Sequence, residues 1–287
     1  MNANTALTLP QSQSRLPIER RIMRFDYKDI ESPVFHSDNA VVSAYWVGLS
    51  SSFPLGEAEF IKSVRLFEDQ ITDARLKDEV QDFAAQEAHH GLQHKLVNKR
   101  FDEVGYKTSH IEKFMVEKLD ERVRNWSPEK RLMHTVAAEH FTATMAHYAL
   151  THADTLGIEP DSVHNLFLWH AIEEIEHKSV AFDVYLNCVG NRFKLRRHYA
   201  FFAFIEFPLN MIAMTRFLLK DRGHKTTWAE RKGMWQHLFG KQGLFRACWG
   251  QYMSFFKKDF HPWQHDDSAL VAEWKEKLAP YFAHQPQ

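Results

Sequence analysis

Six acidic and imidazole side chains interrupt otherwise apolar helical patterns in this sequence, and they are Glu57, Glu87, His90, Glu139, Glu174 and His177. Glu87 and His90 are three residues apart, as are Glu174 and His177, and this spacing places carboxylate and imidazole on one face of a helix. One further acid, Glu57 or Glu139, precedes each pair. In a helical bundle, one Glu from each of two helices and a Glu-x-x-His pair from each of two others can bind two metal ions.

The charge of these side chains supports a pair of cations. Four carboxylates and two neutral imidazoles carry a charge of −4, which is costly to bury unless something neutralises it. Two divalent ions would cancel it. Oxygen ligands with imidazole favour iron or manganese, and the pattern contains no thiolate that would favour zinc. We therefore predict two iron ions as the cofactor, with manganese as an alternative and zinc as a poorer fit.

Four helices are needed to position these residues, and they are predicted over 57–67, 75–101, 128–150 and 161–188. In each of them apolar residues recur at spacings of three and four, which is the period of a helix with one buried face. Ser127 followed by Pro128 marks the start of the third helix, and Gly190 follows the end of the fourth. Glu57 closely follows Pro54, so we expect it in the first turn of its helix.

Four polar neighbours share the site or adjoin it. Gln86 and Glu173 each directly precede a ligand Glu, a place from which they could orient an imidazole on the facing helix. His94 and His170 lie one turn from His90 and Glu174, and we expect them to be partners of the ligands or core histidines rather than extra ligands. The remaining polar residues near the motifs lie away from the apolar faces of the predicted helices, and we expect them to be solvent-facing or structural. They are His89, His140, Glu176 and Asp183.

The composition excludes other classes of protein. The 287 residues include 36 basic and 37 acidic side chains, a net charge of −1, so no broad positive field exists to hold nucleic acid. Two cysteines, Cys188 and Cys248, cannot form a disulfide framework, and they fit a reducing compartment. Residues 1–17 are polar and lack the apolar run of a secretory signal. These observations predict a cytoplasmic location.

The fold class predicted from these patterns is all-α. No run with a period of two is long enough for a sheet, and no repeat of solenoid length is present. Residues 1–30 are expected to be disordered or extended, with Arg20, Arg21 and Arg24 solvated. Residues 31–287 are expected to form a single domain, with the metal-binding bundle over about 52–190 and an aromatic-rich helical extension over about 195–287. Shorter helices are predicted over 111–123 and from 268 onward.

An apolar stretch over 199–219 lies outside the predicted bundle. It is nearly long enough to cross a bilayer, but Glu206, Pro208 and Arg216 interrupt it, so we expect a buried fifth helix that covers the bundle. Glu206 could face the metals as an additional carboxylate, although a salt bridge is the expected role. Basic residues flank the stretch, so the segment 192–225 could also contact an anionic membrane surface from the cytoplasmic side.

The motifs around the ligands resemble a known group of proteins, and they are residues 53–57 (FPLGE), 86–90 (QEAHH), 138–140 (AEH), 173–185 (EEIEHKSVAFDVY) and 260–263 (FHPW). They are similar to those of the ferritin-like di-metal carboxylate superfamily, and more closely to those of a bacterial family labelled predicted metal-dependent hydrolase. The resemblance extends over most of the chain, from about 20 to 267. It implies a ferritin-like four-helix bundle with additional C-terminal helices and a dinuclear site, and it leaves the reaction open.

Three functions are compatible with such a site. The first is a di-iron oxidoreductase that activates O₂ with an electron donor and oxidises a small apolar or lipid-like substrate. The second, which the family label implies, is a hydrolase in which two cations generate a hydroxide and stabilise the leaving oxygen. The third is a non-catalytic metal-binding or membrane-associated bundle. No catalytic residue beyond the metal ligands and no oligomeric state is predicted.

Overall fold

The computed structural model describes residues 15–282, and all regular elements in that range are helical except two isolated bridges, Met23–Phe282 and His36–Ile158. The predicted all-α class is therefore confirmed for the described residues. The helices are α1 (Ala40–Arg65), α2 (Ala74–Glu103), α3 (Thr108–Asn125), α4 (Pro128–Thr151), α5 (Asp161–His177), α6 (Val180–Cys188), α7 (Arg192–Phe201), a π-helical turn (Phe202–Glu206), α8 (Phe207–Asp221), α9 (Trp228–Phe239), α10 (Leu244–Ala247), α11 (Trp249–Ser254) and α12 (Ser268–Leu278).

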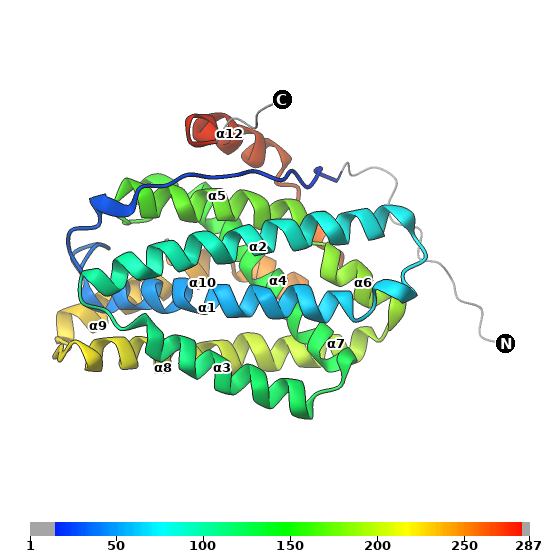
Figure 1. Cartoon of the computed structure of the whole chain (residues 1–287), viewed down its shortest axis with the longest axis horizontal. Helices are drawn as coiled ribbons and strands as arrows, with labels where there is room; N and C mark the ends of the chain where they lie inside the picture. Colours follow the sequence, from blue (N-terminus) through cyan, green and yellow to red (C-terminus); the bar gives the residue numbers. More distant parts are fainter. Residues whose placement is uncertain (1–14, 283–287) are drawn as a thin grey trace.

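Four helices surround the predicted ligands. α1 lies against α2, and α4 lies against α5; α1 also contacts α4, and α2 contacts α5 and α6. Helices α3 and α8 pack on the other side of α1 (Figure 1). The predicted start of the third helix is confirmed, because the Ser127 hydroxyl accepts a hydrogen bond from the Lys130 amide.

The prediction for the helix that carries Glu57 is wrong at its start. α1 begins at Ala40, where the Asn39 side chain accepts hydrogen bonds from two backbone amides, and Pro54 lies inside the helix. A proline in a helix leaves the carbonyl four residues earlier without its donor. Here that carbonyl belongs to Ser50, and it accepts a hydrogen bond of 3.2 Å from the Asn98 side chain of α2. Glu57 consequently lies in the middle of a long helix.

Replacing Asn98 with alanine is expected to destabilise the protein. Asn98 also accepts a hydrogen bond of 2.7 Å from the Ser50 hydroxyl, so the change removes two partners of buried polar groups. We expect the free energy of unfolding to fall by about 1–3 kcal/mol, measured by urea denaturation. Lys99→Ala, at the exposed neighbouring position, is the control. Equal stabilities for the two variants would show that Asn98 does not stabilise the helix at Pro54.

The single helix predicted over 161–188 is divided in two. α5 ends at His177 and α6 begins at Val180. The FHPW turn packs on this break, where the Trp263 indole donates a hydrogen bond of 2.9 Å to the Ser179 hydroxyl. The break lies directly after His177, so the whole Glu-x-x-His pair remains on α5.

The apolar stretch over 199–219 is only partly covered by the protein. It lies in a continuous helix of 30 residues, Arg192–Asp221, and 44% of its most apolar window is buried. Phe201, Ile205 and Leu209 are among its side chains that remain nearly half exposed or more. The expectation of a buried fifth helix is therefore only partly met. Within the described residues, this is the one helix that has the length and hydropathy of a membrane span, a test that core helices of soluble proteins also pass.

The chain before α1 runs as an extended segment along α2 and α5 (dark blue in Figure 1). The Met23 amide donates to His89 at 3.1 Å, and the Met23 carbonyl accepts from Gln93 at 3.0 Å. The prediction that Arg21 is solvated is wrong, because its side chain is only 7% exposed. Residues 1–14, part of the segment predicted to be disordered or extended, lie outside the described residues.

Candidate metal centre

The six predicted ligands converge in the middle of the bundle, and each is at most 5% exposed. They come from all four helices, with Glu57 on α1, Glu87 and His90 on α2, Glu139 on α4, and Glu174 and His177 on α5. Because every ligand lies within a helix, the backbone on either side holds it in place.

Three overlapping groups of side chains could each hold a metal ion, with donor atoms within 4.8 Å of one another, and they are Glu57–His90–His170, Glu87–His90–Glu174 and Glu87–Glu139–His177. Glu57 and Glu139 belong to different groups, whereas Glu87 is shared by two. A carboxylate shared between neighbouring groups could contribute an oxygen to each of two ions.

Several donor atoms of these residues have no hydrogen bond to any other described residue. Both carboxylate oxygens of Glu57, Glu87 and Glu139 are buried without a hydrogen bond, and so are His90 Nδ1 and His177 Nε2. Buried polar atoms normally have a partner, because leaving one without costs about 1–3 kcal/mol. Carboxylate oxygens and imidazole nitrogens that are buried without a hydrogen bond can bind a hard or borderline divalent cation. The side chains present therefore fit the predicted cofactor.

The pKa values of the buried carboxylates indicate that negative charge is crowded at the centre. Burial and the neighbouring carboxylates raise the pKa of Glu57 and Glu139 well above the usual range. Burial would lower the pKa of His177, but the carboxylates of Glu174 and Glu87, 3.6 and 3.1 Å from its Nε2, raise it well above the usual value. Crowded negative charge of this kind favours the binding of cations at the centre.

Two polar neighbours orient the predicted imidazole ligands. His90 Nε2 lies 3.1 Å from a Glu173 oxygen, and His177 Nδ1 lies 2.9 Å from the Gln86 amide oxygen. Both oxygens are acceptors, so each imidazole donates its N–H outward and presents its other nitrogen to the centre. These are the contacts that the sequence analysis expected for Gln86 and Glu173.

Arg21, which the sequence pattern predicted to be solvated, anchors both of these contacts. Arg21 donates to Glu173 at 3.2 Å and to the two oxygens of Glu176 at 2.6 and 2.9 Å. Glu176 in turn accepts a hydrogen bond of 2.9 Å from Gln86. Glu176 was predicted to be solvent-facing or structural. It is 1% exposed, and its contacts with Arg21 and Gln86 help to hold the imidazole ligands. The signal in the sequence was the density of acids over 173–177, which requires a nearby cation once the helix is buried.

A chain of hydrogen bonds leads from Asn98 and Ser50 through His94 to His170, which lies beside the predicted ligands. Asn98 uses its amide group on the Ser50 carbonyl, so its oxygen accepts from the Ser50 hydroxyl. That hydroxyl then accepts from His94 Nδ1 at 2.9 Å.

His94 continues this chain of donors to His170. Burial and the nearby His170 lower the pKa of His94 well below its usual value, so its ring is neutral. His94 Nε2 therefore accepts from His170 Nδ1 at 2.8 Å. His170 Nε2 then faces Glu174 Oε1 at 2.9 Å and Glu57 Oε1 at 3.5 Å. An imidazole nitrogen and two carboxylate oxygens that face one another can hold a cation between them.

Glu206 is directed away from the centre. Its carboxylate pairs with Arg122 of α3 and lies 3.6 Å from Lys118. The option of an additional metal-facing carboxylate is thus wrong, and the expected salt bridge is confirmed. The reason is the π-helical turn at 202–206, which gives this residue a direction that a regular helical period does not predict.

The cavity that touches the centre is small and mostly apolar. It has a volume of about 40 Å³, and Glu174, His170 and Thr142 meet side chains such as Phe53 and Met145 in its wall. The space is far smaller than the roughly 300–1,000 Å³ of pockets that hold organic ligands, and it offers a substrate few polar side chains.

Comparisons with known proteins agree with a metal site. The family described as predicted metal-dependent hydrolase matches residues 19–266, most of the chain and all of the ligands above. No curated protein and no solved structure matches the chain. The family description supports the hydrolase alternative better than the oxidative hypothesis. With its buried Glu and His clusters and this match, the chain belongs to the predicted metal-dependent hydrolase family.

Proposed function

We propose that the protein is an enzyme with a dinuclear metal centre in a ferritin-like bundle. The observation that carries the proposal is the set of buried, unpartnered donor atoms on facing helices. One ion would bind near Glu57, His90 and His170, and the other near Glu139 and His177. Glu87 and Glu174 would lie between them. His170 is thus a seventh ligand, supported by the chain of hydrogen bonds through His94.

Oxidation of an apolar substrate by O₂ is the reaction that the geometry favours. Two ferrous ions in such a site would supply electrons for the reduction of O₂, with an electron donor restoring them. The protein would hold the ligands and exclude bulk water. Carboxylate-rich donors suit iron, with manganese as the alternative and zinc as the poorer fit. The mainly apolar lining of the cavity beside Glu174 supports this reaction, because it suits an apolar substrate group better than a polar one.

Hydrolysis is the second candidate, and the family description supports it more directly than it supports oxidation. Two bound cations would supply a hydroxide and stabilise the leaving oxygen. A hydrolase of this kind needs a polar mouth for a phosphate or an ester next to the metals. Within residues 15–282 the cavity at the centre is instead small and lined mainly by apolar side chains.

Loading the metal-free protein with ferrous iron under nitrogen and then mixing it with oxygen distinguishes the two reactions. Oxidation predicts transient visible absorbance and uptake of O₂ in proportion to the bound iron. Hydrolysis predicts a colourless protein, indifferent to air, that cleaves p-nitrophenyl esters or phosphates when loaded with zinc or manganese. Glu112→Gln, an exposed change on α3, is the control for handling. Ester or phosphate cleavage without O₂ uptake would contradict the oxidative proposal and leave the metal centre intact.

The cytoplasmic location, the contact of 192–225 with an anionic membrane surface and the absence of a nucleic-acid partner stay predictions. The electron donor is a prediction as well, and it depends on the oxidative reaction.

A further inference from the structure

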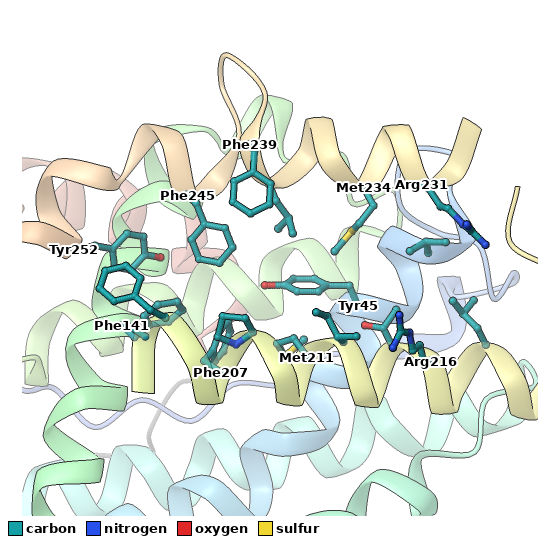
Figure 2. Close-up of a pocket in the computed structure, with 18 of the residues that line it drawn as sticks. Tyr45, Phe141, Phe207, Met211, Arg216, Arg231, Met234, Phe239, Phe245 and Tyr252 are labelled. Carbon is teal, nitrogen blue, oxygen red and sulfur yellow. The ribbon is translucent and has the colours of Figure 1, made fainter. Parts of the chain in front are cut away.

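A second and much larger cavity lies away from the metal centre. Its volume is about 630 Å³, and it is enclosed by α1, α8, α9 and the segment 245–252 (Figure 2). Pockets that hold organic ligands have volumes of about 300–1,000 Å³. Phe204, Ile212, Phe239 and Trp249 line the cavity and are each between 42% and 54% exposed, so it opens to the surface.

The cavity has one charged end and one aromatic end. Arg216 of α8 and Arg231 of α9 face each other at one end, and Phe141, Phe245 and Tyr252 surround the other (Figure 2). Among the described residues neither arginine belongs to an ion pair; the acid next to Arg231, Glu230, is paired with His224 at 2.8 Å. Two guanidinium groups without an acidic partner attract a carboxylate or a phosphate.

Three hydroxyl groups in the wall have no hydrogen-bond partner. They belong to Tyr45, Thr215 and Tyr252, and these residues are 2%, 8% and 3% exposed. Hydroxyl groups buried to this extent normally have a partner, because leaving one without is costly. Of the three, the Thr215 hydroxyl is next to Arg216 in the chain, so a head group with oxygen atoms at the charged end would supply its partner.

We propose that this cavity binds a single anionic amphiphile, a molecule with an apolar hydrocarbon tail and a carboxylate or phosphate head group. The head group lies between Arg216 and Arg231, with Thr215 close by. The tail extends along α8 to the aromatic end. Burial of the tail supplies most of the affinity, and the arginines set the orientation and the preference for an anion.

This binding site is separate from the metal centre. Phe141 lines the large cavity, whereas its neighbour Thr142 lines the small one, where its hydroxyl donates a hydrogen bond to Glu174. Likewise Tyr45 lines the large cavity and Trp46 the small one. Helices α1 and α4 therefore form the wall between the two. Binding of the amphiphile does not depend on the proposed reaction, and it is expected with or without bound metal.

Calorimetric titration of the full chain with oleate tests the site. We expect one oleate per protein for both the metal-free and the metal-loaded forms. Arg216→Gln with Arg231→Gln should weaken binding roughly tenfold or more, and should leave the weaker binding of oleyl alcohol, which lacks the charge, unchanged. Met234→Trp should weaken both ligands, because the larger side chain fills the cavity. Lys232→Gln, an exposed neighbour of Arg231 outside the lining, is the control.

Two results would overturn the proposal. One is the absence of stoichiometric oleate binding in a protein with normal helical circular dichroism, provided that no phospholipid is bound in its place. The other is binding that is equally strong in the arginine and Met234 variants. Incubation with phosphatidylcholine vesicles that contain either oleate or phosphatidylglycerol, followed by mass spectrometry of the separated protein, identifies the source. Recovery of oleate indicates a free acid, recovery of phosphatidylglycerol indicates a membrane lipid, and recovery of neither contradicts the site.

Discussion

Glu87→Ala is expected to abolish binding of both metal ions, whereas Glu57→Ala and Glu139→Ala are each expected to abolish binding of one. The difference follows from the geometry, because Glu87 contributes to two of the donor groups, and Glu57 and Glu139 to one each, on different sides. The measurement is the metal content of loaded and desalted protein, by plasma mass spectrometry or native mass spectrometry. Thermal unfolding with and without metal gives a second measurement, since a ligand that binds only the folded protein raises Tm.

The control for this series is Glu112→Ala, which removes an exposed carboxylate from α3 and should leave two ions bound. Without metal, Glu57→Ala and Glu139→Ala should be at least as stable as the unchanged protein, because each removes a buried carboxylate that is crowded by other carboxylates. Circular dichroism of Glu87→Ala, which also removes a contact with His177, checks that this variant folds. A loss of metal in these variants is then not a loss of folding. Unchanged binding of two ions in Glu87→Ala would remove the proposed centre altogether.

Arg21→Met is expected to be the most destabilising single change outside the helical core. It leaves the buried carboxylates of Glu173 and Glu176 without their shared partner, and loss of one member of a buried ion pair costs about 3–5 kcal/mol. Lys275 remains 2.6 Å from Glu176, so the lower end of that range is expected. Because Glu173 and Glu176 help to orient His90 and His177, metal affinity should fall by about 10–100-fold.

The neighbouring residue provides a matched control for this prediction. Arg20 also pairs with an acid, Asp82, at 2.7 Å, but its side chain is 57% exposed. Arg20→Met should therefore change the free energy of unfolding by at most about 1 kcal/mol. Urea denaturation of the metal-free proteins measures stability, and competition with a chelator measures metal affinity. Similar small effects for both arginines would mean that the N-terminal segment does not support the centre.

Local regularities made the helical fold and the set of candidate ligands predictable from the sequence. The period of the apolar residues identifies the helices, and a Glu three residues before a His shares its face whatever the rest of the fold does. Where a long-range contact overrides a local rule, the prediction fails. Pro54 predicts a helix start near Glu57, but Asn98, distant in sequence, supplies the donor that lets α1 continue through it.

Other features depend on residues that are far apart in the chain. The sequence predicts that Arg21 is one of several solvated arginines, because the acids that it pairs with, Glu173 and Glu176 on α5, are distant in the chain. From the sequence, Glu206 is a possible ligand, but in the structure the π-helical turn directs its carboxylate to Arg122. His170 is predicted to be a core histidine or a partner of the ligands, and only the fold places its Nε2 2.9 Å from Glu174 and 3.5 Å from Glu57.

Residue types and spacings along single helices were enough to establish an all-α chain with two Glu-x-x-His pairs and a buried negative charge that calls for cations. The folded arrangement was needed to show which donors share an ion, which outer side chains orient them, and that a large cavity with two free arginines lies behind α1 and α4. The physical reason is the range of the interactions. Helix period and face depend on neighbours three or four residues apart, whereas coordination, ion pairing and cavity shape depend on packing between segments that the sequence separates widely.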